Sequence, residues 1–190
     1  MPQDTSNMDR RDFFRRAGGG AAVVGMGLAA QQAHAKRAVQ KTDPHAPTTG
    51  RLLKPDETIG IGMIGVGGMG SGHVGELLER EKGGEKQQVR AICDCYTLRQ
   101  NANKKRVKET AGRDVETYYD YAKLLERDDI HAVVVATPDH WHAQISIDAM
   151  KAGKDVYCQK PVTLTIPESV EVRDASYETG RVFQCGAQRS

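Results

Sequence analysis

The sequence predicts an α/β fold of the Rossmann type, with a doubly wound parallel sheet between two layers of helices. Six short apolar segments alternate with helix-like segments across residues 58–190. The segment 132–136 is apolar throughout, as expected for a strand buried on both faces of a parallel sheet. A glycine-rich turn directly follows the first apolar segment, where a strand would meet a helix. Right-handed crossovers then favour the strand order 3-2-1-4-5-6, with three layers in all.

Each element has its own signal in the sequence. In the first helix, Val74, Leu77 and Leu78 recur at the spacing that places them on one helical face. Thr165 and Glu168 stand three positions apart, as in a capping box at the start of the last helix. The expected strands are 58–64, 88–94, 116–119, 132–136, 155–158 and 181–185. The expected helices are 68–81, 98–109, 120–125, 141–152 and 165–179.

The glycine-rich turn has the spacing of a dinucleotide-binding fingerprint, Gly65-x-Gly67-x-x-Gly70. In such a motif Gly65 allows a tight turn, Gly67 lets the backbone approach a pyrophosphate, and Gly70 lets the helix pack against the strand. The helix N-terminus then offers free N–H groups to the phosphates. The alternative is a glycine-rich turn that binds no ligand. The candidate cofactor-binding residues of this loop are Gly65, Gly67, Gly68, Met69 and Gly70.

Asp94 ends the second expected strand, 24 positions after Gly70. There a carboxylate accepts hydrogen bonds from both hydroxyls of the adenine ribose of NAD, and its charge repels a 2′-phosphate. NAD is therefore the expected cofactor. Arg99 lies nearby and keeps NADP possible. The alternative for Asp94 is a surface residue in a turn.

Residues 1–35 have the organisation of an export signal. The segment Asp9-Arg10-Arg11-Asp12-Phe13-Phe14-Arg15 resembles the twin-arginine signal, although Asp9 stands where Ser or Thr is usual. An uncharged run of 14 residues, 17–30, follows, and a small-x-small cleavage site comes at 33–35. We expect the twin-arginine machinery to export the protein to the periplasm or the cell exterior. The alternative is a basic N-terminus without a sorting role.

Composition narrows the remaining choices. The segment 36–57 carries three prolines and little apolar periodicity, so it is expected to be a flexible linker. The formal net charge is only +2, so neither a nucleic-acid partner nor a membrane surface is expected, and the apolar run is too short for a membrane span. All four cysteines are expected on strands, with Cys93 and Cys95 on the same face of one strand. They are interpreted as small buried hydrophobes. The cysteines match no metal-binding spacing, and no metal site is expected.

Two further motifs carry a family resemblance. They are Ala136-Thr137-Pro138-Asp139-His140-Trp141-His142 and Gln159-Lys160-Pro161. Together with the glycine loop, they resemble the glucose–fructose oxidoreductase, inositol dehydrogenase and MocA family across 58–190. The resemblance implies an NAD(P)-binding domain followed by a substrate domain, which supplies much of the substrate pocket and the oligomer interface. That second domain is expected to be absent from this chain, and an oligomer is expected only with it.

The resemblance also implies roles for individual residues. Lys160 would lie beside the nicotinamide as part of the cofactor site and take the proton of a substrate hydroxyl during hydride transfer. Thr137 and Pro138 would help to position the nicotinamide half of the cofactor. His142 would face the dinucleotide or the substrate as a second catalytic candidate, or else it caps or packs the next helix. Gln159 replaces the family's usual Glu and is expected to keep its hydrogen-bonding geometry near the cofactor.

Two functions remain open from the sequence. The first is an exported NAD(P)-dependent oxidoreductase that acts on a hydroxyl of a sugar, an inositol or a related polyol. One variant of it oxidises the sugar transiently to enable glycoside cleavage. The second is a dinucleotide-binding module without activity of its own. In either case this chain alone is expected to be inactive, because the substrate domain is needed for turnover.

Overall fold

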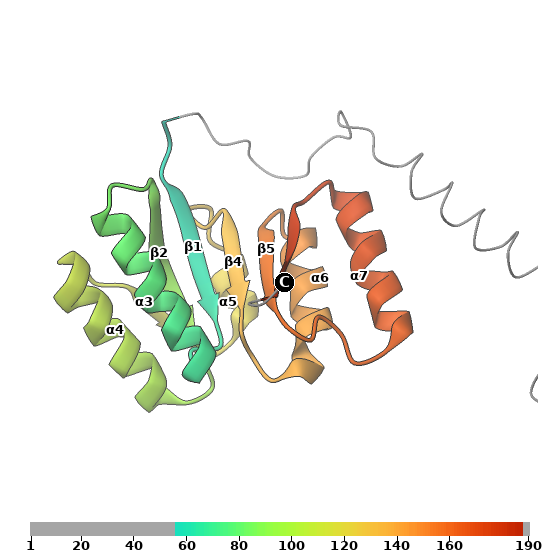
Figure 1. The fold of residues 1–190 in the computed structure, drawn as a ribbon, viewed down its shortest axis with the longest axis horizontal. Helices are drawn as coiled ribbons and strands as arrows, with labels where there is room; N and C mark the ends of the chain where they lie inside the picture. Colours follow the sequence, from blue (N-terminus) through green and yellow to red (C-terminus); the bar gives the residue numbers. More distant parts are fainter. Residues whose placement is uncertain (1–55, 188–190) are drawn as a thin grey trace, which may run out of the picture. The chain divides into compact units, whose positions relative to one another are not determined.

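The computed structural model describes residues 56–187, which form a six-stranded parallel sheet with helices on both faces (Figure 1). The predicted export signal and nearly all of the predicted linker lie outside the described residues. The strand order is β3-β2-β1-β4-β5-β6, which confirms the predicted order. The strands are β1 (Ile59–Ile64), β2 (Gln87–Cys93), β3 (Glu116–Tyr118), β4 (Ala132–Val135), β5 (Asp155–Gln159) and β6 (Phe183–Gly186). The helices are α3 (Gly68–Lys82), α4 (Thr97–Ala111), α5 (Tyr121–Leu125), η2 (Asp139–Trp141), α6 (His142–Lys151) and α7 (Ile166–Thr179).

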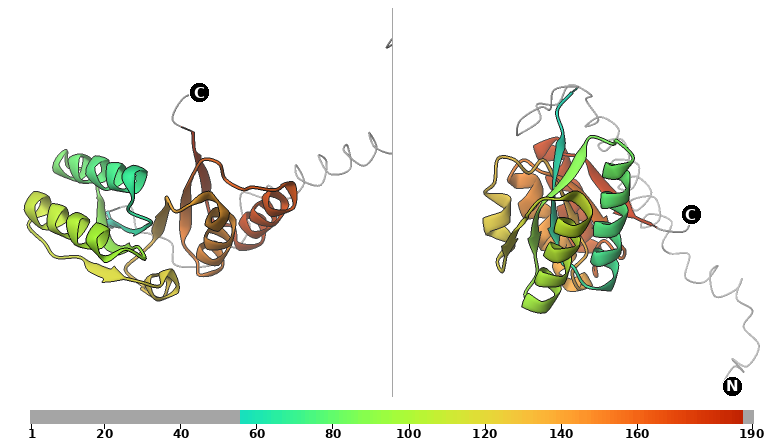
Figure 2. Two further views of the ribbon diagram at one scale, coloured as in Figure 1. Left: turned by 90° about the horizontal axis from the view of Figure 1, so that it is seen from below. Right: turned by 90° about the vertical axis from the view of Figure 1, so that its left-hand side faces the viewer.

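The helices divide between the two faces of the sheet as a doubly wound topology requires. Helices α3 and α4 cover one face, and α5, α6 and α7 lie on the other (Figure 2). Each face has its own buried cluster, because successive side chains of a strand point to opposite faces. Met63 packs in the cluster on the α3 side, with Val74 and Leu78. Its neighbour Ile64 packs on the α6 side, which confirms the predicted three layers.

Local signals fix the helix ends as the sequence predicts. The Asp120 side chain accepts a hydrogen bond of 2.9 Å from the N–H of Ala122 at the start of α5. At the start of α7, Thr165 and Glu168 form the reciprocal hydrogen bonds of a capping box. Gly180 ends α7 in the left-handed conformation.

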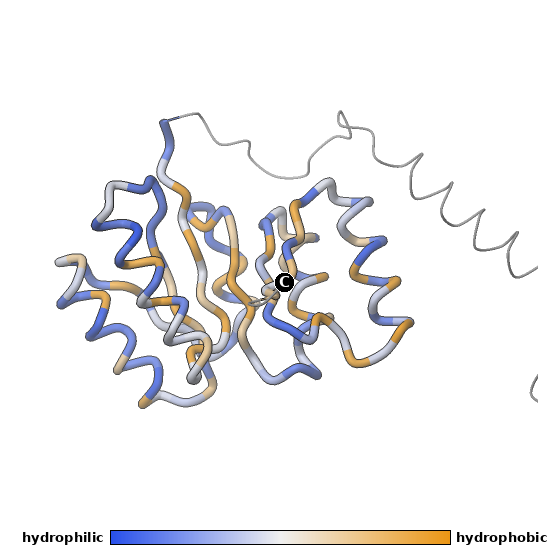
Figure 3. The backbone as a smooth tube through the Cα atoms, in the orientation of Figure 1, coloured by the Kyte–Doolittle hydropathy of each residue, from blue (hydrophilic) through white to orange (hydrophobic). Residues whose placement is uncertain are grey.

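The apolar residues lie mainly along the strands, whereas α4 is strongly polar (Figure 3). The buried residues of α4 are Gln100, Asn103 and Val107, so two of the three are amides. A buried amide costs free energy unless it is hydrogen-bonded. These two side chains therefore need partners in the neighbouring elements, and the partners lie at the candidate site.

The cysteine prediction is only half right. Cys93 and Cys158 are buried, and desolvation raises the pKa of Cys93 to about 12, with the charge of Asp94 adding to it. Burial likewise raises the pKa of Cys158 to about 11. Cys95 and Cys185 are exposed, because β2 ends at Cys93 and Cys185 lies on the edge strand β6.

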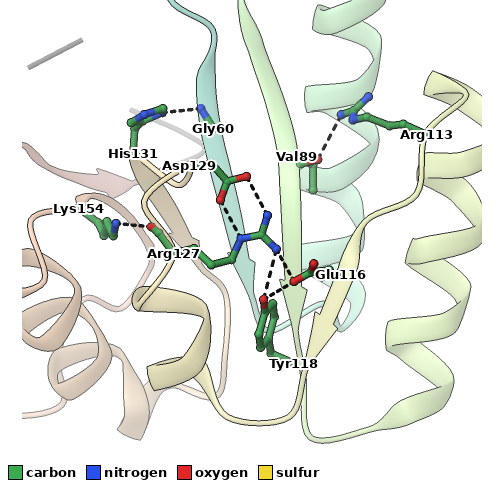
Figure 4. Close-up of polar contacts among 9 residues, drawn as sticks. All are labelled: Gly60, Val89, Arg113, Glu116, Tyr118, Arg127, Asp129, His131 and Lys154. Atoms are coloured by element: carbon green, nitrogen blue, oxygen red, sulfur yellow. Dashed lines mark hydrogen bonds and ion pairs between the residues drawn. The ribbon is translucent and has the colours of Figure 1, made fainter. Parts of the chain in front are cut away.

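A polar cluster at the amino-terminal end of β1 holds the loop before β4 (Figure 4). The guanidinium of Arg127 donates two hydrogen bonds of 2.8 Å to Asp129 and one of 2.7 Å to Glu116. These hydrogen bonds hold the pKa of Asp129 below its usual value. The ammonium of Lys154 donates to the carbonyl of Arg127 at 2.7 Å. The cluster ties the loop after α5 to β3 and to the residue before β5.

Candidate cofactor-binding site

The glycine loop joins β1 to α3 at the point where the strand order reverses. Gly65 has a φ of +84°, and a Cβ there would lie 2.7 Å from the backbone of Ala136 and Thr137. A Cβ on Gly70 would lie 2.0 Å from the carbonyl oxygen of Gly65. No side chain fits at either position without moving backbone. This agrees with the roles predicted for both residues, a tight turn and close packing of helix on strand.

The other loop glycines face open space. A Cβ on Gly68 would meet nothing within 4 Å. A Cβ on Gly67 would approach only the guanidinium of Arg99, at 3.2 Å, the far end of a flexible side chain. The fold itself therefore does not require glycine at these two positions. The open space is what a ligand lying against the loop backbone needs.

The N-terminus of α3 points into this space without a cap of its own. Gly67 is the N-cap residue, no side chain caps it, and the first turn has no acidic residue. The hydrogen bond from Ser71 N–H to the Gly67 carbonyl, 2.8 Å, closes the first turn. The N–H groups of residues 68–70 precede it and are the orphan donors of a helix start. Together with the helix dipole they fit an anionic group such as a diphosphate.

Asp94 lies directly behind the loop, and its side chain is engaged there. It is 8% exposed. One carboxylate oxygen accepts the N–H of Val66 at 2.8 Å, and the other accepts the N–H of Tyr96 at 2.9 Å. The carboxylate therefore ties the glycine loop to the end of β2. The sequence did not predict this contact, and ribose binding by Asp94 stays a prediction.

The two buried amides of α4 complete this support. Gln100 donates to the carbonyl of Tyr118 at 2.9 Å and also contacts the carbonyl of Asp94. Asn103 donates at 3.0 Å to the hydroxyl of Ser71, which itself donates to the carbonyl of Val66 at 2.8 Å. Neither residue was predicted from the sequence. Two amides three positions apart, in line with Val107, were the available signal, because that face of the helix must be buried.

Arg99 brings a cationic group to the mouth of the loop. Its guanidinium lies 5.7 Å from the centre of the Tyr96 ring, in a cation–π arrangement, and both side chains are exposed. The same guanidinium is the nearest group to Gly67. A phosphate or an adenine ring beside the loop would therefore meet Arg99 and Tyr96.

Thr137 and His142 lie at the end of β4. The His142 ring is 2% exposed, with Nδ1 2.7 Å from the carbonyl oxygen of Pro161 and Nε2 2.9 Å from that of Thr137. The ring thus bridges the loops that follow β4 and β5. This geometry favours a positioning role over the catalytic role predicted for His142. The hydroxyl of Thr137 is buried and has no hydrogen-bond partner among residues 56–187, so a ligand group could supply one.

Lys160 is exposed directly after β5, at the same edge of the sheet as the glycine loop. Gln159 before it is 4% exposed and points inward. Its amide nitrogen contacts Nε2 of His73 in α3, and its amide oxygen accepts the N–H of Lys160 at 3.3 Å. His73 was not predicted from the sequence, and it lies 86 positions away from Gln159 in the chain.

A separate groove of about 420 Å³ lies on the α3 side of β4 and β5. Ile61, Val134, Val156 and Val182 line it, and His73 and Tyr157 also border it. No residue of the glycine loop lines this groove, so it is not the candidate cofactor site. Within residues 56–187, no cluster of His, Cys, Asp or Glu is placed to hold a metal ion. No helix in the same range is long and apolar enough to cross a membrane.

Doubly wound α/β proteins bind dinucleotides at the switch point of the sheet, where a glycine turn leads into an open helix N-terminus. The site therefore defines a dinucleotide-binding domain. The chain belongs to the oxidoreductase family with an NAD-binding Rossmann fold, whose model matches residues 59–187. This confirms the resemblance that the sequence motifs carry.

The chain is also similar to individual proteins of this kind. The chain is 30% identical, over 181 residues, to an α-N-acetylgalactosaminidase of Shewanella oneidensis, covering 91% of this chain and 38% of the relative. An NAD-binding protein from Listeria innocua is 27% identical with a TM-score of 0.58, covering 68% of this chain and 35% of that one. Apo scyllo-inositol dehydrogenase from Lactobacillus casei is 25% identical with a TM-score of 0.59, covering 70% and 37%. The chain thus spans well under half the length of these relatives.

Proposed function

We propose that this chain is the nucleotide-binding part of an exported NAD(P)-dependent oxidoreductase that acts on a hydroxyl of a sugar, an inositol or a related polyol. One observation carries the proposal: the open glycine loop at the uncapped start of α3 shares a sheet edge with the exposed amine of Lys160. An anion-binding loop and a side chain able to exchange a proton are the two parts that alcohol oxidation needs. The names of two relatives, a glycosidase and an inositol dehydrogenase, support a polyhydroxylated substrate.

Each part of the site has its own role in the proposed reaction. The loop around Gly67 and the start of α3 hold the diphosphate, and Asp94 keeps that loop in place. The end of β4 supports the nicotinamide half, where the hydroxyl of Thr137 is available as a partner. A bound nicotinamide supplies the acceptor for the hydride that leaves the hydroxyl-bearing carbon. The amine of Lys160 takes the hydroxyl proton as the carbonyl forms. The relatives are more than twice as long, so the walls of the substrate pocket are expected in a second domain.

A second candidate activity is glycoside cleavage through transient oxidation. The curated relatives with 30% identity over 91% of this chain are named as an α-N-acetylgalactosaminidase and as glycosyl hydrolases of family 109. In that reaction the hydride returns to the sugar after the bond breaks, so no NADH accumulates. Incubating the full-length protein with a glycoside and with the free sugar separates the two. Release of the aglycone at a constant NAD⁺ level supports cleavage, whereas accumulation of NADH supports net oxidation.

The cofactor preference can be tested at Asp94. We expect the chain to bind NAD more tightly than NADP, since a carboxylate accepts ribose hydroxyls and repels a 2′-phosphate. Hydrogen bonds to a charged group contribute about 1.5–3 kcal/mol, so Asp94→Ala should lower the preference for NAD over NADP by about 10- to 150-fold. Calorimetric titration of both cofactors measures it. Arg99→Ala is the matched variant and should weaken NADP more than NAD. If Asp94→Ala lost affinity equally for both cofactors, Asp94 would support the loop without setting the cofactor preference.

The proposed export can be tested apart from the enzyme. Residues 1–40, fused to a reporter that works only after folded export, should deliver it to the periplasm. Changing Arg10 and Arg11 to Lys should abolish delivery, because the signal is read through the arginine pair. Changing Arg15 and Arg16 to Lys is the matched control and should preserve most of it. Delivery that survives the loss of the first pair contradicts the twin-arginine assignment.

A further inference from the structure

The helix that starts at the glycine loop also contacts the strand end that carries Lys160. His73 lies in the second turn of α3, and its Nε2 meets the side-chain amide nitrogen of Gln159. The His73 ring also packs edge-on against Tyr157 of β5, with ring centres 5.5 Å apart and planes at 77°. The side chain of His73 is 14% exposed, so the contact is largely shielded from water. Two elements far apart in the chain therefore meet through one buried polar contact.

The hydrogen-bond directions in this contact are determined by the backbone of Lys160. Its N–H can only donate, and it points at Oε1 of Gln159 over 3.3 Å. The amide NH₂ of Gln159 therefore faces His73 and donates to it. Nε2 of His73 must then be the acceptor, which leaves the ring proton on Nδ1. Nδ1 lies 3.8 Å from a carboxylate oxygen of Glu76, whose charge favours a proton there.

We infer that His73 is a positioning residue for Lys160 and acts through Gln159. The inference rests on the proposed role of Lys160. With Nε2 unprotonated, His73 holds the Gln159 amide in the one orientation that also receives the Lys160 N–H. The chain of hydrogen bonds connects the helix at the phosphate site to the residue that exchanges the proton.

The opposite ring state breaks this chain. A proton on Nε2 would meet the amide NH₂, and rotating the amide would turn that NH₂ against the Lys160 N–H. His73 borders the groove described above, whose charged lining residues are Glu76 and Arg80 on α3, Glu85 after it, and Asp155 on β5. Glu76 is the one that faces the ring at 3.8 Å. If His73 only packed against Tyr157, either ring nitrogen could carry the proton. The position of that proton is therefore the property that tests the positioning role.

Nitrogen NMR of the 190-residue chain tests the inference without cofactor or substrate. At alkaline pH the wild-type His73 ring should carry its proton on Nδ1. In Gln159→Glu the carboxylate can only accept, so the proton should move to Nε2 and the shifts of the two nitrogens should exchange. His73→Phe keeps an aromatic ring against Tyr157 and removes the acceptor, so the amide signal of Lys160 should move. His140→Phe, at an exposed histidine, is the control and should leave both signals in place.

Two results would overturn the inference: a wild-type ring with its proton on Nε2, or ring signals that do not exchange in Gln159→Glu. The wild-type measurement alone decides it if the variant fails to fold. In the full-length enzyme, His73→Phe should lower kcat without changing the Kd of NAD, and His73→Asn, which restores an acceptor, should recover part of kcat. An NAD titration of the same samples tests the proposed function separately. A chain that binds no NAD but shows the Nδ1–H ring contradicts only the proposed function.

Discussion

Replacing Lys160 by Met should lower kcat of the full-length protein by about 10²- to 10⁴-fold, the range that a positioned proton acceptor contributes. The Kd of NAD should stay within about twofold of the wild-type value. The reason is geometric, since Lys160 is exposed after β5, whereas the glycine loop and Asp94 follow β1 and β2, which lie on the other side of β4. Methionine keeps most of the length and the apolar stem of lysine but has no amine. Steady-state rates with a panel of sugars and inositols, together with calorimetric NAD titration, measure both quantities.

The matched control for this variant is Lys151→Met. Lys151 is also exposed, but it ends α6 at the opposite edge of the sheet, so its loss should leave kcat unchanged. The 190-residue chain alone should bind NAD and turn over no substrate, because the hydroxyl carbon must be held about 3–3.5 Å from the nicotinamide by walls that lie elsewhere. Ordinary turnover by this chain alone, or by the Lys160→Met variant, contradicts the proposed division of labour.

The sequence predicts the elements and their order well because both follow from local patterns. Apolar periodicity locates the strands, and glycines and capping residues mark the helix ends, so most predicted boundaries lie within one or two residues. The one consequential error comes from a strand end. Cys95 was assigned to the same strand face as Cys93, but β2 stops at Cys93 and the chain turns at Asp94. Side chains beyond the last ladder bond no longer alternate between faces.

The glycine loop illustrates what could be predicted of the site. Gly65 and Gly70 have the steric roles that the motif predicts, and Gly67 and Gly68 have the open space. What could not be predicted are contacts between residues far apart in sequence. The bond from Val66 to Asp94 spans 28 positions, and the contact between His73 and Gln159 spans 86.

His142 shows the same limit from the other direction. Its motif points to the site, yet the structure places the ring between the carbonyls of Thr137 and Pro161. Sequence motifs indicate which residues gather at the strand ends. They do not indicate which atoms of those residues are already engaged.

Substitutions at Gly67, Gly68 and Gly70 can separate effects on stability from effects on ligand binding. Gly70→Ala should destabilise the protein by about 3 kcal/mol, the upper end of the usual cost of overpacking, because the new methyl would lie 2.0 Å from the backbone carbonyl oxygen of Gly65. Helix α3 would have to move away from β1, and the anion site at its N-terminus would move with it. NAD binding should be lost together with stability. Urea unfolding followed by fluorescence, and calorimetric titration with NAD, measure the two effects.

Gly67→Ala and Gly68→Ala are the matched variants. Both should fold within about 1 kcal/mol of the wild type, since a methyl at Gly67 meets only the mobile Arg99 side chain and one at Gly68 meets nothing within 4 Å. Only Gly67→Ala should weaken NAD binding, by at least about tenfold, because this glycine is where the backbone approaches the pyrophosphate. If Gly67→Ala bound NAD as tightly as the wild type, the pyrophosphate would not lie against Gly67. A stable Gly70→Ala with normal affinity would mean that α3 can shift without disturbing the site.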